Sequence, residues 1–128
     1  MSYYFTTTID APFEAAVART RQALAEEGFG VITEIDVAKT LKTKIDVDFR
    51  PYLILGACNP TLAHEALMLE DKVGTMLPCN VVVQAAGSDR TEISAIDPVA
   101  SMQAIGNPQL AEKAVLVAGK LKAALARI

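Results

Sequence analysis

One apolar run, Tyr52-Leu-Ile-Leu55, constrains the fold of this 128-residue chain more than any other feature of its sequence. The run has no polar alternation, which is typical of a strand covered on both faces. Gly56 and Ala57 then permit a neighbouring segment to approach closely. Asn59-Pro60 indicates a helix start, because Asn is a preferred N-cap residue and Pro is favoured at the first helical position. The sequence therefore predicts a buried central strand that leads directly into a helix, with Cys58 between them.

Hydrophobic periodicity predicts the elements on either side of that strand. Apolar residues alternate over the segments expected to be strands, and they recur every three or four residues over those expected to be helices. Asp36 and Asp97 are expected to cap two short helices. Besides the central run, the predicted strands cover 3–9, 29–35, 80–86 and 91–96, and the predicted long helices cover 10–28, 60–71 and 109 to near the end.

This order of elements predicts a single domain over residues 1–128 with an α+β fold. The expected architecture is a two-layer sandwich, in which one mixed or mostly antiparallel sheet of about five strands carries the long helices on one face. If the other face of the sheet is apolar, a second copy of the chain is the simplest cover for it. The sequence therefore predicts a homodimer.

Composition and charge argue against several classes of function. Hydrophobic residues make up 52% of the chain and charged residues 21%, which indicates a packed globule rather than a disordered segment. The net charge is -3 and the basic residues are scattered, so neither nucleic acid nor a membrane is expected as a partner. The N-terminus lacks a signal-peptide pattern and no apolar run is long enough to span a membrane, so we expect a cytoplasmic location.

The two cysteines, Cys58 and Cys79, each precede an asparagine beside an expected strand. A helix N-terminus next to Cys58 would favour its thiolate, whereas free cysteine is also often buried as a small hydrophobic residue. Cytosolic cysteines are normally reduced, so no disulfide is expected. If the two strands are neighbours, both thiols and the amides of Asn59 and Asn80 line one polar pocket. As an alternative, the asparagines serve only as caps or turn residues.

Two further polar residues complete the candidate site. His64 lies in the second turn of the helix that Asn59 caps, where it could act as a base toward Cys58 or form only a surface hydrogen bond. Asp97 is either a helix N-cap or a functional carboxylate. Cys58, Cys79 and His64 could bind copper or zinc only if they converge, so no metal site is predicted. The candidate ligand-binding residues are Cys58, Asn59, His64, Cys79, Asn80 and Asp97; no cofactor and no catalytic residue is assigned.

Several short segments of the chain carry a family resemblance. They are Gly28-Phe-Gly-Val31, Thr33-Glu-Ile-Asp36, Phe49-Arg-Pro-Tyr52, Gly56-Ala-Cys-Asn-Pro60, Ala63-His64, Leu77-Pro-Cys-Asn80 and Ile96-Asp-Pro98. In order and spacing they resemble the prokaryotic family known as domain of unknown function 302, over nearly the whole chain. The resemblance implies a small soluble α/β sandwich that commonly pairs as a dimer. It implies no chemistry, because the family is uncharacterised.

Three functions from different classes are compatible with the sequence. The first is a small-ligand binding or sensing module with a polar site at the Cys-Asn strand ends, which we favour because no complete catalytic constellation is present. The second is a thiol enzyme or redox protein that uses Cys58 or Cys79 as nucleophile, although no resolving-cysteine motif accompanies either. The third is a structural or regulatory dimer without pocket chemistry. The sequence does not decide whether the protein is an enzyme.

Overall fold

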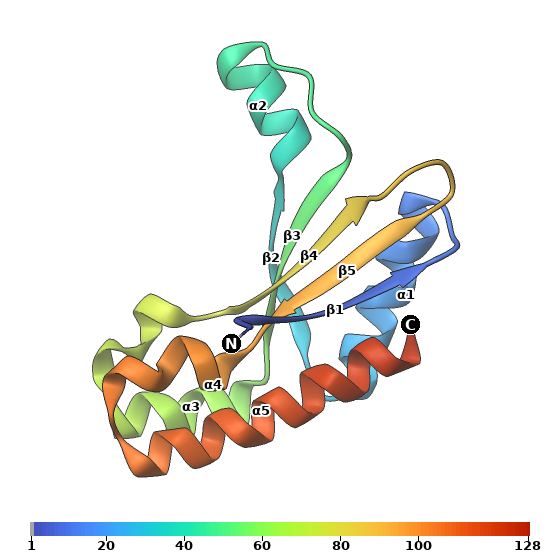
Figure 1. Cartoon of the computed structure of the whole chain (residues 1–128). Coiled ribbons are helices and arrows are strands. Elements are labelled where there is room, and N and C mark those ends of the chain that lie inside the picture. Colours follow the sequence, from blue (N-terminus) through green and yellow to red (C-terminus); the bar gives the residue numbers. More distant parts are fainter. Residues whose placement is uncertain (1) are drawn as a thin grey trace.

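The strands and helices follow one another along the chain in the predicted order, and the computed structural model describes residues 2–128. The sheet has the strand order β1-β5-β4-β3-β2, and each neighbouring pair is antiparallel. The predicted α+β fold with a five-stranded sheet is therefore confirmed (Figure 1). The strands are β1 (Tyr4–Ile9), β2 (Gly30–Asp36), β3 (Tyr52–Cys58), β4 (Cys79–Ala85) and β5 (Thr91–Ile96).

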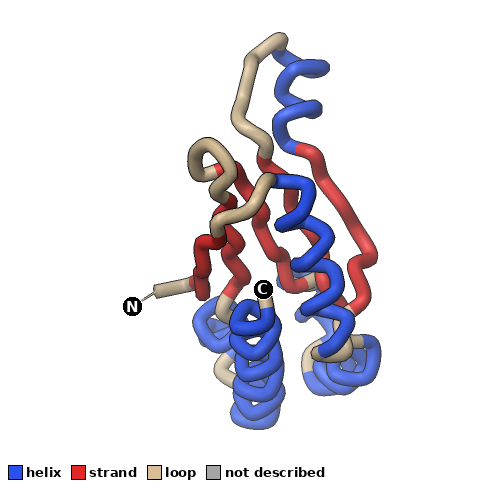
Figure 2. The backbone as a smooth tube through the Cα atoms, turned by 90° about the vertical axis from the view of Figure 1, so that its right-hand side faces the viewer, coloured by secondary structure: helices blue, strands red, loops and turns tan. Residues whose placement is uncertain are grey.

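The two longest helices, α1 (Phe13–Glu26) and α5 (Pro108–Arg127), pack together against the same face of the sheet. Three shorter helices are α2 (Val37–Ile45), α3 (Pro60–Leu69) and α4 (Pro98–Met102), with the 3-10 turns η1 (Asp71–Met76) and η2 (Gln103–Ile105). Figures 1 and 2 show that α2 stands apart from the other helices, beyond one end of the sheet. The helices α3 and α4 lie at the opposite end. Within residues 2–128, none of the helices combines the length and apolar character needed to cross a membrane.

The main core lies between the sheet and the helices α1 and α5. Side chains alternate along a strand, and Leu55, Val83 and Ile93 point to the same face, where they are fully buried. Leu24 of α1 and Leu121 of α5 are fully buried against them. The alternate side chains of the strands point to the opposite face of the sheet. Within the described residues, no helix layer covers the middle of that face (Figure 1).

The apolar run of β3 is covered on only one face within a single chain. Leu53 and Leu55 are buried in the core, whereas Tyr52 and Ile54 point to the other face and are only half-buried. The sheet order also makes β4 its middle strand and places β3 one position from the edge. The expectation of a central strand covered on both faces is therefore wrong for the isolated chain, because strand order depends on pairing partners that a local apolar run does not specify.

Side-chain caps start α2, α3 and α4 where the sequence predicts them, whereas α1 begins at Phe13, later than predicted, and has no side-chain cap. The α5 helix begins slightly earlier than expected, because Asn107 accepts hydrogen bonds from the backbone N–H groups of Gln109 and Leu110. Each of the three predicted caps accepts one backbone N–H group. Asp36 accepts that of Lys39 at 2.9 Å, Asn59 that of Leu62 at 3.1 Å, and Asp97 that of Val99 at 3.0 Å.

The α3 helix ends at Leu69, slightly before the predicted end. Glu70 has an extended backbone, with φ -152° and ψ 106°, which breaks the helical path. The chain then continues as the 3-10 turn η1, in which Val73 is fully buried. One predicted helix is thus two shorter elements, and both pack at the end of the sheet from which α2 is absent (Figure 1).

Candidate functional site

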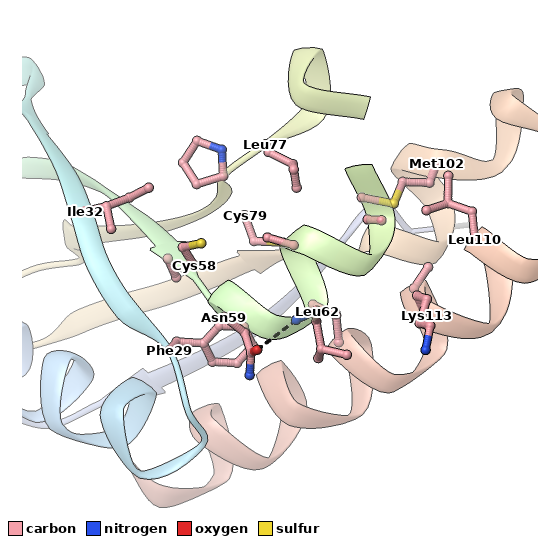
Figure 3. A pocket seen from close by; sticks show the side chains of 16 residues that line it. Phe29, Ile32, Cys58, Asn59, Leu62, Leu77, Cys79, Met102, Leu110 and Lys113 are labelled. Carbon is pink, nitrogen blue, oxygen red and sulfur yellow. Dashed lines mark hydrogen bonds between the residues drawn. The ribbon is translucent and has the colours of Figure 1, made fainter. Parts of the chain in front are cut away.

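A cavity of about 220 Å³ lies where the ends of β3 and β4 meet α3 and α5 (Figure 3). Most of the side chains around it are apolar. The strand ends contribute Ala57, Cys58 and Cys79, and the segments beside them contribute Phe29, Ile32, Asn59, Leu77 and Pro78. The helices contribute Leu62, Ala63, Ala66, Met102, Leu110, Lys113, Ala114 and Val117.

The cavity lies between two hydrophobic clusters. The sheet cluster comprises the buried residues between the sheet, α1 and α5, and it includes Phe29, Ala57 and Cys79. The end cluster comprises Ala66, Val73 and Leu110 with the partly buried residues packed on them, Leu69, Leu77, Met102 and Ile105. Members of both clusters line the cavity. Alanines occupy facing positions on α3 and α5, at Ala63, Ala66 and Ala114, and their small side chains leave the space unfilled.

The two cysteines occupy adjacent strands at the cavity. Cys79 pairs with Ala57 across β3 and β4, so Cys58 is one residue further along β3. Cys79 is buried, and burial raises the pKa of its thiol from the ordinary 9.0 to about 11, with the nearby Cys58 adding a smaller increase. Cys58 is half-buried. Since successive residues point to opposite faces of a strand, the two thiols start on opposite faces of the sheet, an arrangement that does not suit a disulfide.

Asn59 belongs to the cavity lining, but its amide oxygen already has a structural task. It accepts the backbone N–H of Leu62 and so caps α3, as the dashed line in Figure 3 shows. The amide nitrogen lies beside Gly28, where a Cβ atom would come within 3.1 Å of it. Gly28 has φ +86°, the left-handed conformation expected of a glycine that ends a helix. The capping interpretation of Asn59 is therefore confirmed.

The structure does not bring the other three candidates into this cavity. Asn80 follows Cys79 in β4 and therefore points to the opposite face of the sheet, where it lines a separate hollow. His64 is exposed on α3 and is absent from the cavity lining. Asp97 caps α4 through the N–H of Val99. The site predicted as one polar pocket is thus divided, and the part that holds the cysteines is mainly apolar.

The three side chains considered as soft metal ligands, Cys58, Cys79 and His64, do not converge. Within residues 2–128, no three side chains of the types His, Cys, Asp and Glu are arranged to hold a metal ion. His64 is exposed, whereas Cys79 is buried. The arrangement of Cys58, Cys79 and His64 therefore gives no support to the copper or zinc alternative.

Residues of α5 form much of the cavity wall although no sequence pattern assigned them to a site. Lys113 is the charged member of the lining, and its ammonium forms an ion pair with Glu65 of α3 at 2.8 Å. Figure 3 shows the Lys113 nitrogen at the edge of the group of lining side chains, so that mainly its methylene stem faces the cavity. The signal available in the sequence was the recurrence of alanines on the inner faces of two helices.

Comparisons with known proteins agree with the sequence resemblance. The family model described as "Domain of unknown function DUF302" matches residues 5–128. The chain is also similar to the crystal structure of an uncharacterised conserved DUF302 protein from Bacillus stearothermophilus, with 30% sequence identity and a TM-score of 0.91. That similarity covers 99% of this chain and 98% of the other. No curated protein matches the chain.

Proposed function

Because the chain belongs to the family of domain of unknown function DUF302, whose description assigns no activity, we propose a function from the site itself. The protein is a small-ligand binding or sensing module that takes a small, neutral, apolar molecule into the cavity beside Cys58 and Cys79. This proposal keeps the binding module predicted from the sequence and replaces its polar pocket with an apolar one.

The observation that carries this proposal is the unfilled apolar space between the two hydrophobic clusters. Protein interiors are close-packed, and voids larger than a water molecule are few. An apolar cavity does not hold water well and is available to apolar guests; a cavity of about 150 Å³ suffices for benzene. The cavity of about 220 Å³ here therefore has room for a small aromatic or aliphatic molecule.

The polar groups of the lining favour a neutral ligand. Glu65 already neutralises Lys113, and the amide oxygen of Asn59 is engaged with α3. The Cys79 thiol, whose pKa is raised by burial to about 11, is neutral near pH 7 and offers no charge to a ligand. A charged ligand would lose its hydration with no free partner of opposite charge in this lining, which is costly.

The alternative of a thiol enzyme has less support. A catalytic nucleophile needs an accessible thiolate, and burial disfavours that form for Cys79. Cys58 is more accessible, but His64, the base considered for it, is exposed and does not line the cavity. The remaining alternative is a structural dimer without pocket chemistry. It predicts that no small molecule binds in the cavity.

Titration with toluene and with indole, followed by amide chemical shifts of the full chain, tests the proposal. We expect saturable shifts at residues of the cavity lining, and a ligand at ten times its Kd to raise the free energy of unfolding by roughly 1.4 kcal/mol. Ala114→Leu fills the cavity and is expected to weaken binding at least tenfold. Ala63→Leu fills it from α3 and provides a second variant if the first does not fold.

Ala126→Leu is the matched control, because Ala126 is exposed on α5 and lies outside the cavity lining. It should bind both molecules as the unmodified protein does. Shifts confined to other surfaces, or binding that persists unchanged in folded Ala114→Leu and Ala63→Leu proteins, would show that this cavity is not the ligand site.

A further inference from the structure

We propose that the separate hollow lined by Asn80 binds a neutral sugar. The hollow lies on the open face of the sheet, which is the side opposite α1 and α5, and its volume is about 410 Å³. Small-molecule sites typically have volumes of roughly 300 to 1,000 Å³. The hollow shares no lining residue with the cavity beside Cys58 and Cys79, so this inference goes beyond the function proposed above and is independent of it.

The floor of the hollow is a connected row of polar side chains. Strand pairing places Gln84 of β4 beside Glu92 of β5, and Ser94 of β5 beside Thr6 of β1. Gln84 donates to Oε1 of Glu92 at 3.3 Å, and Ser94 donates to the same oxygen at 3.4 Å. A further hydrogen bond of 3.0 Å joins the hydroxyls of Ser94 and Thr6. These bonds orient the row before any ligand arrives, which lowers the cost of binding.

The hydrogen-bonding groups left free in this lining suit hydroxyl groups. Both bonds to Glu92 end on Oε1, and within residues 2–128 its Oε2 accepts no hydrogen bond. Asn80 is exposed, and its amide offers two donors and one acceptor oxygen. A hydroxyl both donates and accepts, so a sugar can donate to the carboxylate and exchange hydrogen bonds with the amide. A hydrogen bond to a carboxylate is stronger than one between neutral groups.

The charges at the hollow favour a neutral ligand over an ion. Glu92 is the charged member of the lining, and it disfavours an anion. Arg50 lies beside the same row, where its Nε donates to the side-chain oxygen of Gln84 at 2.9 Å, and it disfavours a cation. The guanidinium also lies over the ring of Tyr52, 5.7 Å from the ring centre, so that ring already has a cationic partner. A neutral sugar meets neither repulsion.

Aromatic rings border the polar floor on two sides. Tyr4 belongs to β1 and Tyr52 to β3, with β5 and β4 between them in the sheet. Tyr3 lies against Tyr4, with ring centres 5.0 Å apart, and both side chains are exposed. A sugar ring has hydroxyls at its edge and C–H groups on its faces, and an aromatic ring offers those faces an apolar surface. Polar floor and aromatic border together match this amphipathic shape, which a linear polyol lacks.

Titration of the full chain with glucose, maltose, cellobiose and lactose, followed by amide chemical shifts, tests this proposal. We expect saturable shifts with at least one of these sugars, centred on the amides of β4 and β5 around Gln84 and Glu92. Glycerol carries hydroxyls without a ring face and should bind at least about tenfold more weakly. Choline and citrate serve as the cationic and anionic probes, and neither should bind as tightly as the best sugar.

Two variants locate the bound sugar. Glu92→Ala removes the carboxylate and should weaken binding at least about tenfold. Asn80→Ala, at an exposed position, should also weaken it and is the second variant if the first does not fold. Glu112→Ala is the matched control, because Glu112 is exposed on α5 outside both linings.

Three results would overturn the proposal. The first is the absence of saturable shifts with every sugar, which is also the result expected if a partner chain closes the hollow. The second is tighter binding of choline or citrate than of any sugar. The third is unchanged sugar binding in the folded Glu92→Ala and Asn80→Ala proteins. None of these results depends on whether the cavity binds toluene.

Discussion

At the scale of single residues, the two cysteines show how one position along a strand changes chemistry. Cys79 starts β4 on the core face and is buried, whereas Cys58 ends β3 on the other face and is half-buried. Burial disfavours a thiolate, and a neighbouring thiol that can also ionise adds to the effect. Two residues of the same type at one cavity are thus expected to differ strongly in reactivity.

Alkylation with iodoacetamide at pH 8, followed by mass spectrometry, should show this difference. With its pKa raised from 9.0 to about 11, native Cys79 should react roughly 100-fold more slowly than in the unfolded chain, because each pKa unit changes the thiolate fraction about tenfold. Cys58 should be modified first. The Cys79→Ser variant in guanidinium identifies the contribution of Cys58. Equal rates for Cys79 in the native and unfolded chain would contradict the prediction.

The same shift has a consequence for stability at high pH. The native state keeps the Cys79 proton between pH 9 and about 11, where the unfolded state loses it. Stability falls with rising pH wherever the native state binds more protons. The contribution of Cys79 is therefore complete below pH 9 and is lost as the pH rises toward 11, and the Cys79→Ser variant should lack this part of the pH dependence.

At the scale of elements, the start of α5 is held by one side chain that serves two helices. Asn107 accepts the N–H groups of Gln109 and Leu110, and its amide nitrogen contacts the backbone oxygen of Leu69 at the end of α3, at 3.5 Å. The cap therefore fixes both the first turn of α5 and its position beside α3. These two helices form opposite walls of the cavity.

Asn107→Ala should lower the free energy of unfolding by about 1 to 2 kcal/mol, because two N–H groups lose their partner. Urea denaturation measures this change. Gln109→Ala is the matched control, since Gln109 is exposed in the same turn, and its effect should stay within about 0.5 kcal/mol. If the two variants are equally stable, the side-chain cap does not contribute as the geometry indicates.

At the scale of the whole molecule, the cavity divides the hydrophobic interior. The sheet cluster contains residues of β3, β4, β5, α1 and the C-terminal half of α5, whereas the end cluster joins α3, η1, α4 and the start of α5. Apolar contacts that would bind the two clusters together are reduced where the cavity lies. Regions with fewer buried apolar contacts open locally at a lower free energy than the global core.

Native-state hydrogen exchange should therefore show two levels of protection. Amides of β4 and β5 should exchange only through global unfolding, and those of α3 and η1 should exchange through a smaller opening. Saturation with toluene should slow the second group more than the first, because a guest restores contacts between the clusters. A single level of protection across both groups would show that the interior behaves as one unit despite the cavity.

Local signals explain how much of the fold could be predicted. The caps Asp36, Asn59 and Asp97 lie where the sequence places them, because an N-cap needs only the next few residues to form. Gly56 also confirms the close approach expected there: a Cβ atom would lie 2.7 Å from Pro78 and closer still to Thr33. The positions of the strands could also be predicted, since alternation is a property of each strand by itself.

The candidate site could be predicted only in part. The proximity of Cys58 and Cys79 follows once β3 and β4 are neighbours. The strand alternation of β4 already implied that Asn80 points away from Cys79, but the shared Cys-Asn motif suggested a common pocket. The alanines on the inner face of α5, such as Ala114, did not by themselves indicate a cavity, because that helix is distant in sequence and is brought to α3 only by packing.

Taken by itself, the sequence determined which segments are strands and helices, where several of them begin, and which residues form the apolar face of the longest helices. These properties depend on residues within a few positions of one another. The tertiary structure alone decided the order of the strands, the division of the polar residues between two faces, and the space left between α3 and α5. Those features depend on contacts between segments far apart in the chain, and the volume that two facing side chains fail to fill exists only once both helices are in place.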